Sequence, residues 1–318
     1  MPQQVARTTD AGDGIVAVDT LYMRPSADAS HLVIADGRAA FVDTGTNDSV
    51  PYLLDALRQY DLDPGDVDYV FLTHVHLDHA GGAGTLMQAL PNARCVIHPR
   101  GAPHMADPAK LIAGTQGVYG KDKAFELYGE IVPIAAERID VAGDEDRFSF
   151  GGREVRALHT EGHARHHYSL HDPQSRGVFT GDSFGISYRE LDTDKGEFIF
   201  PTTTPPHFDP TEAHKAVDRI MAQDPVKLYL THYSRVTDVG RLANDMHECL
   251  DGFVAIAQQH RDRDDRREAI QRGLFDFLYA RLAAHGYDRG REAAQAFLEH
   301  DMVLNSQGLD AWLSWLER

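Results

Sequence analysis

The segment from Thr73 to Gly82, T-H-V-H-L-D-H-A-G-G, holds three histidines and an aspartate within six positions: His74, His76, Asp78 and His79. Neutral imidazoles and carboxylates are the ligands that zinc and related divalent ions prefer. The segment follows the apolar run Val70–Leu72 and leads into a helical pattern. We therefore interpret it as a metal-binding segment at a strand-to-helix junction.

Three further polar positions follow strand-like runs later in the chain: His163, Asp182 and His232. The ends of strands meet at one edge of a sheet, where loops build binding sites. Seven ligands are too many for one tetrahedral zinc ion and fit two ions that share a carboxylate. Any single histidine among the 18 of this chain is more often a surface or core residue than a metal ligand. The interpretation of His163 and His232 as ligands therefore depends on the clustered motif at His74–His79.

The spacing of apolar residues predicts the elements that carry these side chains. The runs 15–24 and 31–42 are expected to form strands, and the second run to form a hairpin that turns at Asp36-Gly37. Later strands are expected at Val67–Leu72, Arg94–His98, 153–158, 167–171, 177–179 and 226–230. Helices are expected after Ser49, from Gly82 to about Leu90, and from Asp209-Pro210. Residues 102–130 are expected to mix helix and loop.

Beyond Arg241 the apolar residues repeat at helical spacing to the end of the chain. We expect about four helices there, and therefore a domain of residues 1–240 followed by a helical extension of residues 241–318. Apolar stripes on such helices must be buried. The extension is expected to cap the entrance of the site, with a homodimer interface as the alternative.

Composition limits the partners and the location. The formal net charge of −18 argues against nucleic acid, since no run of Lys and Arg offsets it. No apolar run is long enough to span a bilayer, and residues 1–14 do not resemble a secretory signal. The two cysteines, Cys95 and Cys249, match no metal-binding spacing and suit a reducing compartment. We expect a cytoplasmic protein that acts on a small molecule and associates with neither membrane nor nucleic acid.

Residues 15–240 resemble the metallo-β-lactamase-fold hydrolases. The resemblance is carried by the H-x-H-x-D-H motif and by Asp43-Thr-Gly45, Gly162-His163, Gly181-Asp182 and Thr231-His232. It implies an α/β protein with a four-layer αβ/βα sandwich and a dinuclear site at one edge. By the same resemblance, one metal would be bound by His74, His76 and His163, and the other by Asp78, His79 and His232. Asp182 would bridge the two ions, and Asp43 would support the site without binding metal.

The bridging aspartate separates this chain from the true β-lactamases of the fold. The resemblance is then to the glyoxalase II, lactonase, phosphotriesterase-like and tRNA-processing branches, and the net charge disfavours the last of these. We expect two divalent ions, zinc first, with iron or manganese as alternatives. A hydroxide bridging the metals would hydrolyse a small ester, thioester, lactone or phosphoester, and Asp78 and Asp182 would be the catalytic residues. The alternatives are an iron-dependent oxygenase or redox protein, and a sensor with slow hydrolase activity.

Other residues are weaker candidates for contacts around the substrate. His166 and His167 follow His163; one of them could face the pocket, although a histidine paired with solvent at the start of a strand is the preferred interpretation. The lactonases resembled here carry a tyrosine three residues after the bridging aspartate, where this chain has Gly185, so Tyr188 would have to take that place. His207 lies in the proline-rich loop 198–208, which is expected to wall the pocket, and Tyr233 adjoins His232.

Overall fold

A computed structural model describes residues 5–318 and contains two β-sheets. The first sheet runs in sequence order: β1 (Thr8–Gly12), β2 (Ile15–Asp19), β3 (Ala29–Ala35), β4 (Arg38–Val42), β5 (Val67–Leu72), β6 (Arg94–Ile97) and β7 (Ile139–Val141). Strands β1 to β4 pair antiparallel, and β4 to β7 pair parallel. The hairpin turn at Asp36-Gly37 lies where it was predicted, between β3 and β4.

The second sheet contains the rest of the strands: β8 (Arg147–Phe150), β9 (Arg153–His159), β10 (Tyr168–Asp172), β11 (Gly177–Gly181), β12 (Lys227–Leu230) and β13 (Ser234–Val236). All neighbours pair antiparallel except β11 and β12, which are parallel. The strands β1, β7, β8 and β13 had not been predicted. They are only three to five residues long, so their sequences hold too few positions for an apolar alternation to predict a strand.

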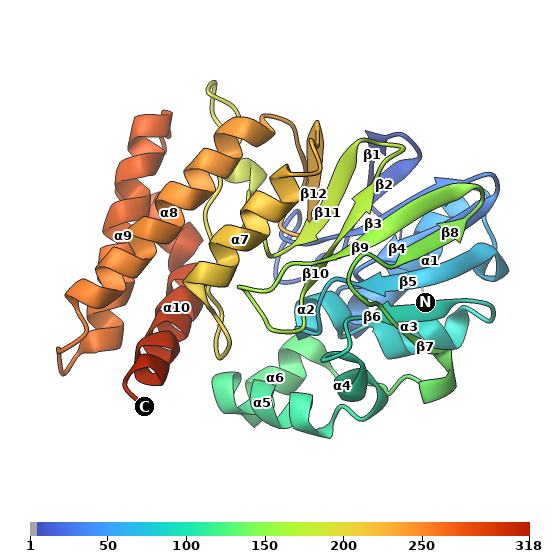
Figure 1. Ribbon diagram of the computed structural model, residues 1–318, viewed down its shortest axis with the longest axis horizontal. Helices are drawn as coiled ribbons and strands as arrows, with labels where there is room; N and C mark the ends of the chain where they lie inside the picture. The colour runs from blue at the N-terminus through green and yellow to red at the C-terminus, as the bar shows by residue number, and fades with distance from the viewer. Residues whose placement is uncertain (1–4) are drawn as a thin grey trace.

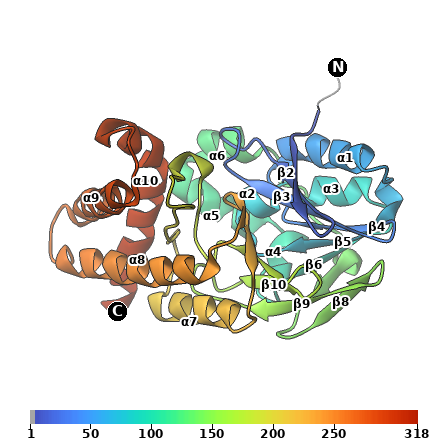
Figure 2. The same ribbon diagram turned by 90° about the horizontal axis from the view of Figure 1, so that it is seen from above.

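Helices cover the outer faces of both sheets (Figures 1 and 2). The α-helices of residues 5–318 are α1 (Val50–Gln59), α2 (Leu77–Ala80), α3 (Ala83–Ala89), α4 (Ala102–Ala106), α5 (Ala109–Tyr119), α6 (Lys121–Tyr128), α7 (Pro210–Met221), α8 (Val239–Gln259), α9 (Arg266–His285) and α10 (Arg291–Leu316). Leu53 and Leu57 of α1 pack on the first sheet, and Val217 and Ile220 of α7 pack on the second. A third apolar cluster, which includes Phe71 and Phe179, fills the space between the sheets. The predicted αβ/βα sandwich is confirmed.

The C-terminal segment contains three helices, α8, α9 and α10, and the prediction of four was wrong. The stripes at Ala294–Leu298 and Leu309–Leu316 belong to one helix, α10. The polar residues between them do not end the helix because they bind the loop 198–208. Asn305 Oδ1 accepts a hydrogen bond from Thr203 N at 2.6 Å. A Cβ on Gly308 would lie 1.3 Å from Thr203 O, so only glycine permits this close approach.

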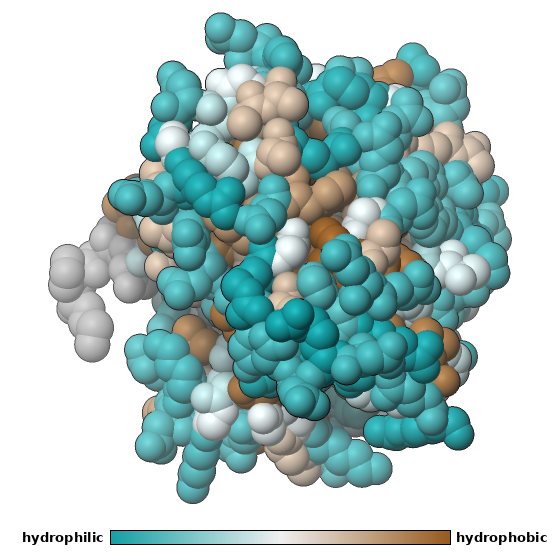
Figure 3. All heavy atoms as spheres, turned by 90° about the vertical axis from the view of Figure 1, so that its left-hand side faces the viewer, coloured by the Kyte–Doolittle hydropathy of each residue, from teal (hydrophilic) through white to brown (hydrophobic). Residues whose placement is uncertain are grey.

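The three C-terminal helices gather at one end of the molecule, beside the second sheet (Figures 1 and 2). Their apolar side chains form one cluster with residues of the segment 186–213, including Phe200 and Phe208. The outward face of this end is largely hydrophilic, with small hydrophobic patches (Figure 3). The domain boundary at 240/241 and the dimer interface stay predictions; α8 begins at Val239, just before that boundary.

Two further features agree with the sequence. Cys95 and Cys249 are both buried free thiols. Within residues 5–318, none of the helices combines the length and the apolar character that a membrane span requires.

Candidate metal centre

The seven ligand candidates all follow strands and meet where the ends of the two sheets come together. His74 and His76 follow β5, Asp78 and His79 lie in α2, His163 follows β9, Asp182 follows β11 and His232 follows β12. Backbone hydrogen bonds join the sheets at this edge, from Tyr168 N to Thr73 O at 2.9 Å and from Ala29 N to Thr231 O at 2.8 Å. The topology therefore brings together residues that are far apart in sequence.

Two groups of potential ligand atoms form at this edge, each with its atoms within 4.8 Å of one another. The first group contains His74, His76, His163 and Asp182, and the second contains Asp78, His79 and His232. His163 Nε2 lies 3.0 Å from His76 Nδ1 in the first group. This is the grouping that the sequence resemblance implies, although the binding of metal by these residues stays a proposal.

Asp182 lies between the two groups and presents one oxygen to each. Its Oδ1 is 3.2 Å from His79 Nε2 and 3.4 Å from His232 Nε2, and its Oδ2 is 3.4 Å from His163 Nε2. Gly181 places the carboxylate. It has φ +47°, and a Cβ there would lie 2.6 Å from both His167 Nε2 and Thr73 Oγ1. Position 181 therefore requires glycine for steric reasons, which explains why a glycine precedes Asp182.

Several inward-facing atoms of this cluster lack hydrogen bonds. His74 Nε2, His79 Nε2 and Asp182 Oδ1 are buried and make no hydrogen bond within the described residues. An unsatisfied buried polar atom costs about 1–3 kcal/mol, and a cation bound at this edge would satisfy all three. The donor set of imidazoles and carboxylates fits divalent metal ions, zinc included.

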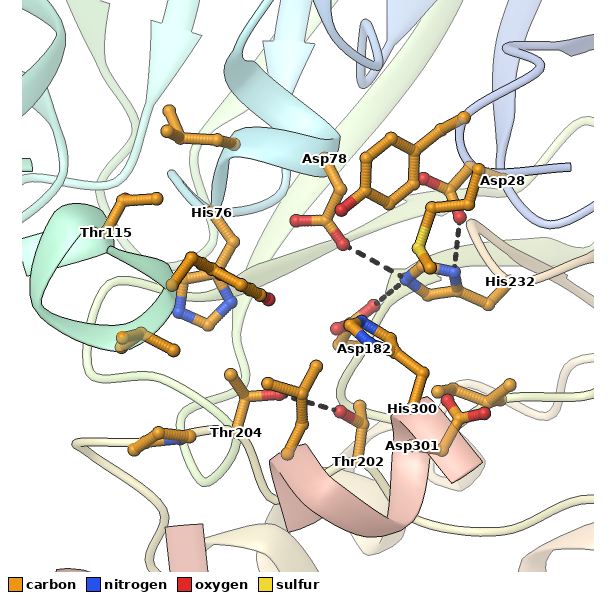
Figure 4. Close-up of a pocket in the computed structure, with 18 of the residues that line it drawn as sticks. Asp28, His76, Asp78, Thr115, Asp182, Thr202, Thr204, His232, His300 and Asp301 are labelled. Carbon is orange, nitrogen blue, oxygen red and sulfur yellow. Dashed lines mark hydrogen bonds and ion pairs between the residues drawn. The ribbon is translucent and has the colours of Figure 1, made fainter. Parts of the chain in front are cut away.

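The outward-facing nitrogen of each second-group histidine is held by a carboxylate. His79 Nδ1 lies 2.8 Å from Asp43 Oδ2, and Asp43 also accepts hydrogen bonds from Thr73 and Thr231. His232 Nδ1 lies 2.6 Å from Asp28 Oδ1 (Figure 4). Because a carboxylate fixes an imidazole N–H on the outer nitrogen, the inner nitrogen keeps the lone pair that a metal needs. In the first group, His163 Nδ1 donates to Thr202 O at 3.1 Å in the same way.

The charges of the two groups differ. Burial and the neighbouring imidazoles hold the pKa of His74 and of His76 well below the ordinary value, so both rings are neutral. Burial also opposes a charge on His232, but Asp28 and Asp182 raise its pKa to about 10. Likewise, Asp182, Asp43 and Asp78 outweigh burial and hold the pKa of His79 well above the ordinary value. The second group thus attracts positive charge, which in the folded chain can be a proton or a cation.

Asp28 was not predicted to belong to the site. Its side chain is buried and ion-paired to His232, yet the sequence gives no signal for it, because Pro25-Ser-Ala-Asp28 is typical of a surface turn. Only the path of the loop between β2 and β3 brings it to His232.

Replacing Asp28 with asparagine is expected to weaken binding of one metal ion by about 10–100-fold, the usual cost of losing a carboxylate behind a histidine ligand. Asparagine keeps the size but presents no charge to the Nδ1–H of His232. Metal affinity is measured by competition with a chromophoric chelator. Asp36→Asn, in the exposed hairpin turn, is the control and should bind like the wild type. Equal affinities for both variants would exclude this role for Asp28.

A cavity of about 610 Å³ opens over the edge where the two ligand groups lie. Its lining includes His76, Asp78, Asp182 and His232, and Figure 4 shows Asp78 and Asp182 directed toward His232. The loop 198–208 and α10 both contribute walls, through Thr202, Thr204, Pro205, Pro206 and His207 and through Phe297, His300 and Asp301. The loop was predicted to wall the pocket, but the sequence did not identify any α10 residue.

The weaker candidates separate into two sets. His166, Tyr188 and His207 line the cavity. Tyr188 O–H donates to Asp301 Oδ1 at 3.2 Å, and burial raises the pKa of both groups, that of Asp301 to about 6. His167 and Tyr233 are not among the described residues that line the cavity.

The interpretation of His166 and His167 as solvent-paired histidines was wrong. His166 is only 8% exposed and faces the cavity. His167 is fully buried behind Asp182, where its Nε2 accepts the Asp182 N–H at 3.1 Å. His166 therefore reaches solvent only through the cavity, and His167 is enclosed by the fold.

Residues 24–232 match the family model described as "Metallo-beta-lactamase superfamily". Among curated proteins, a metallo-beta-lactamase fold-containing protein of Sulfurisphaera tokodaii is 31% identical over 44% of this chain and 50% of its own length. A hydroxyacylglutathione hydrolase of Stenotrophomonas maltophilia is 32% identical over 48% of this chain and 44% of its own length. The chain thus spans half or less of the length of these relatives.

Solved structures show the same fold at lower identity. A metallo-beta-lactamase family protein from Thermus thermophilus superposes with a TM-score of 0.68 at 17% identity, covering 97% of this chain and 95% of that one. An archaeal superfamily protein from Sulfolobus tokodaii gives 0.64 at 21% identity, covering 93% and 98%. A chemotaxis sensor gives 0.54 at 14% identity, covering 77% and 94%.

Proposed function

Because the chain belongs to the metallo-beta-lactamase superfamily, we propose that it is a hydrolase that holds two divalent ions, zinc first, in the two ligand groups described above. The observation that carries this proposal is the position of Asp182. One of its oxygens faces His79 and His232, and the other faces His163. A carboxylate placed in this way is suited to join two ions at one centre.

His74, His76 and His163 would hold one ion, Asp78, His79 and His232 the other, and Asp182 both. Divalent ions in such a centre lower the pKa of a water toward neutrality and polarise the oxygen of the group under attack. Asp43 and Asp28 orient the histidines of the second group. Asp78 faces the cavity, where its carboxylate can receive the proton of the attacking water and pass it to the leaving group.

The cavity lining supports a substrate with an apolar acyl group. Its aromatic and aliphatic side chains include Tyr22, Val75, Leu77, Leu111, Val118, Tyr119, Tyr128, Ile186, Tyr188, Phe297 and Leu304. Its Lys and Arg residues, within the described chain, are Arg24 and Lys110. Arg24 is already paired with Glu190 at 2.6 Å and stacks on Tyr188 and Phe297.

This lining favours a carboxylic ester, thioester or lactone over a phosphoester. The two carboxylates of glutathione need more free cationic side chains than Lys110, which is the one Lys or Arg of the described lining without an ion pair. We therefore propose an apolar acyl substrate rather than the glutathione thioester for which the Stenotrophomonas relative is named. The alternatives, an iron-dependent oxygenase and a sensor, use the same ligand groups and differ in metal and turnover.

The test is elemental analysis of the purified protein, followed by a substrate panel on zinc-loaded protein. The panel contains p-nitrophenyl esters of increasing chain length, acyl-homoserine lactones, S-lactoylglutathione and a phosphodiester. We expect about two zinc ions per chain and the highest kcat/KM on medium-chain apolar esters or lactones. Bound iron with oxygen consumption would support the oxygenase, and no turnover on any substrate would support the sensor.

Phe297→Ala is expected to lower kcat/KM for the best apolar substrate by about tenfold, because a single methylene contact in a hydrophobic pocket is already worth about 1–3 kcal/mol. Phe297 lines the cavity from α10. Phe125→Ala removes the same side chain from the exposed face of α6, where Phe125 is 67% exposed, and should not change kcat/KM. A Phe297→Ala enzyme with unchanged preference along the ester series would place the acyl group elsewhere.

A further inference from the structure

Three tyrosines bring hydroxyl groups to one side of the cavity. Tyr22 lies in the loop between β2 and β3, Tyr119 ends α5 and Tyr128 ends α6, and all three line the cavity. The rings of Tyr22 and Tyr128 are stacked with centroids 5.8 Å apart, and the ring of Tyr119 lies edge-on to Tyr128 at 5.9 Å. We call these three residues the tyrosine wall.

The tyrosine wall carries more hydroxyl protons than the protein accepts. The hydroxyl oxygens of Tyr22 and Tyr128 are 2.9 Å apart, so one of these groups donates to the other. That contact uses one of their two protons. If Tyr119 accepts the second proton, its own O–H is the one left over, because its hydroxyl forms no hydrogen bond to a further group of residues 5–318. The wall therefore retains an O–H without an acceptor in the described chain.

The hydroxyls of the wall keep their protons and lie toward the cavity. Burial, and after it the charge of Asp78, raise the pKa of Tyr22 and of Tyr128. Burial also raises the pKa of Tyr119 to about 12. The effect of Asp78 indicates that the hydroxyls lie on the cavity side, since Asp78 lines the same cavity. A protonated hydroxyl without a protein acceptor donates to water or to a bound molecule.

The surroundings of the tyrosine wall are apolar. Leu77 and Ile131 are buried in the same cluster as Tyr22 and Tyr128, and Leu111 of α5 packs against it. An acyl chain that covers the wall displaces the water there. A plain alkyl chain then leaves an O–H unpaired, whereas a chain with a suitably placed oxygen accepts from it. The wall can thus discriminate between these two kinds of chain.

We propose that the tyrosine wall selects acyl substrates whose chain carries an acceptor oxygen, in a carbonyl or hydroxyl group, beyond the group that is hydrolysed. This inference rests on the proposed function, because it takes the acyl chain to lie in this cavity. Tyr22, Tyr119 and Tyr128 are then specificity-determining residues. One hydroxyl donates a hydrogen bond to the oxygen of the chain, and the rings pack against the methylene groups beside it.

The test measures binding, so that it does not depend on turnover. The ligands are decanoic acid and keto-decanoic acids with the carbonyl at successive chain positions, which are products that the corresponding esters would release. Kd is measured on zinc-loaded full-length protein by displacement of a fluorescent fatty-acid probe. At one chain position or more, the affinity for the keto acid relative to decanoic acid should be about tenfold lower in Tyr22→Phe/Tyr119→Phe/Tyr128→Phe than in the wild type, the usual effect of one hydrogen bond.

The triple variant keeps all three rings, so it should bind decanoic acid at least as tightly as the wild type does. Among the three single variants, the one that removes the outward O–H should show the same loss of preference. Tyr60→Phe/Tyr279→Phe/Tyr287→Phe is the matched control, because these tyrosines are not among the described residues that line the cavity. It should keep the preference of the wild type.

Two results would overturn the proposal. One is the same relative affinity in the wild type and in all variants of the wall at every chain position. The other is an equal loss of affinity for decanoic acid and for every keto acid, which would place the hydroxyls at the carboxyl group. Turnover of p-nitrophenyl decanoate by the wild type is measured separately. Its absence would contradict the proposed hydrolase and leave the comparison of binding unchanged.

Discussion

Replacing Asp182 with alanine is expected to remove at least one of the two proposed metal ions and to lower the proposed hydrolysis by more than about 100-fold. The loss of a carboxylate that only supports a ligand already costs about 10–100-fold, and Asp182 faces both ligand groups directly. Without it, His79, His232 and His163 lose the anion on which they converge, and nothing joins the two ions.

Metal content is measured by elemental analysis after gel filtration, and the rate is measured on the best substrate of the panel. Asp194→Ala is the control, because Asp194 is exposed in the segment that follows β11 and lines no part of the cavity within the described residues. It should keep both ions and the full rate. Full metal content and an unchanged rate in Asp182→Ala would refute the dinuclear centre.

The second large effect is expected on stability, from the buried ion pair between Arg153 and Asp172. Both side chains are fully buried in the second sheet, and the guanidinium also donates to Asp13 O at 2.7 Å in the turn between β1 and β2. The pair thus connects the two sheets. Asp172→Ala leaves an unpaired buried charge, which costs about 3–5 kcal/mol. That is a large share of the roughly 5–15 kcal/mol by which proteins are stable.

Urea denaturation of the zinc-loaded proteins measures this loss. The control is Glu154→Ala, which breaks the pair of Arg147 and Glu154 on the neighbouring hairpin. Those two groups meet at 2.6 Å but are 61% and 46% exposed, so breaking them should cost no more than about 1 kcal/mol. A loss in Asp172→Ala as small as in Glu154→Ala would show that the buried charge is relieved by other groups.

The sequence was most informative where the candidate ligands directly follow a recognisable strand and where a helix begins with a recognisable cap. The run Val67–Leu72 is β5 as predicted, and the H-x-H-x-D-H motif follows it directly. Asp209 caps α7 by accepting from Thr211 N and Glu212 N, with Pro210 in the first turn. These features are local, since a buried strand and a capped helix need only neighbouring residues to be recognised.

The sequence was least informative where contacts are distant. Asp28 reaches His232 only through the fold, and the short polar strand β1 is stabilised by pairing with β2 rather than by its own pattern. The prediction of an extra helix at the C-terminus was wrong for the same reason, since it depended on a distant contact. Asn305 and Gly308 resemble a helix end, but they are the residues by which α10 contacts Thr203.

By itself, the sequence determined the ligand types, their spacing after strands and the family to which the chain belongs. Only the tertiary structure decided which oxygen of Asp182 faces which histidine, which carboxylates stand behind the ligands, and that α10 walls the cavity. The physical reason is that a metal-binding motif consists of residues close together in the sequence. The orientation of a ligand and the shape of a pocket depend instead on side chains that are distant in the sequence and meet only when the chain packs.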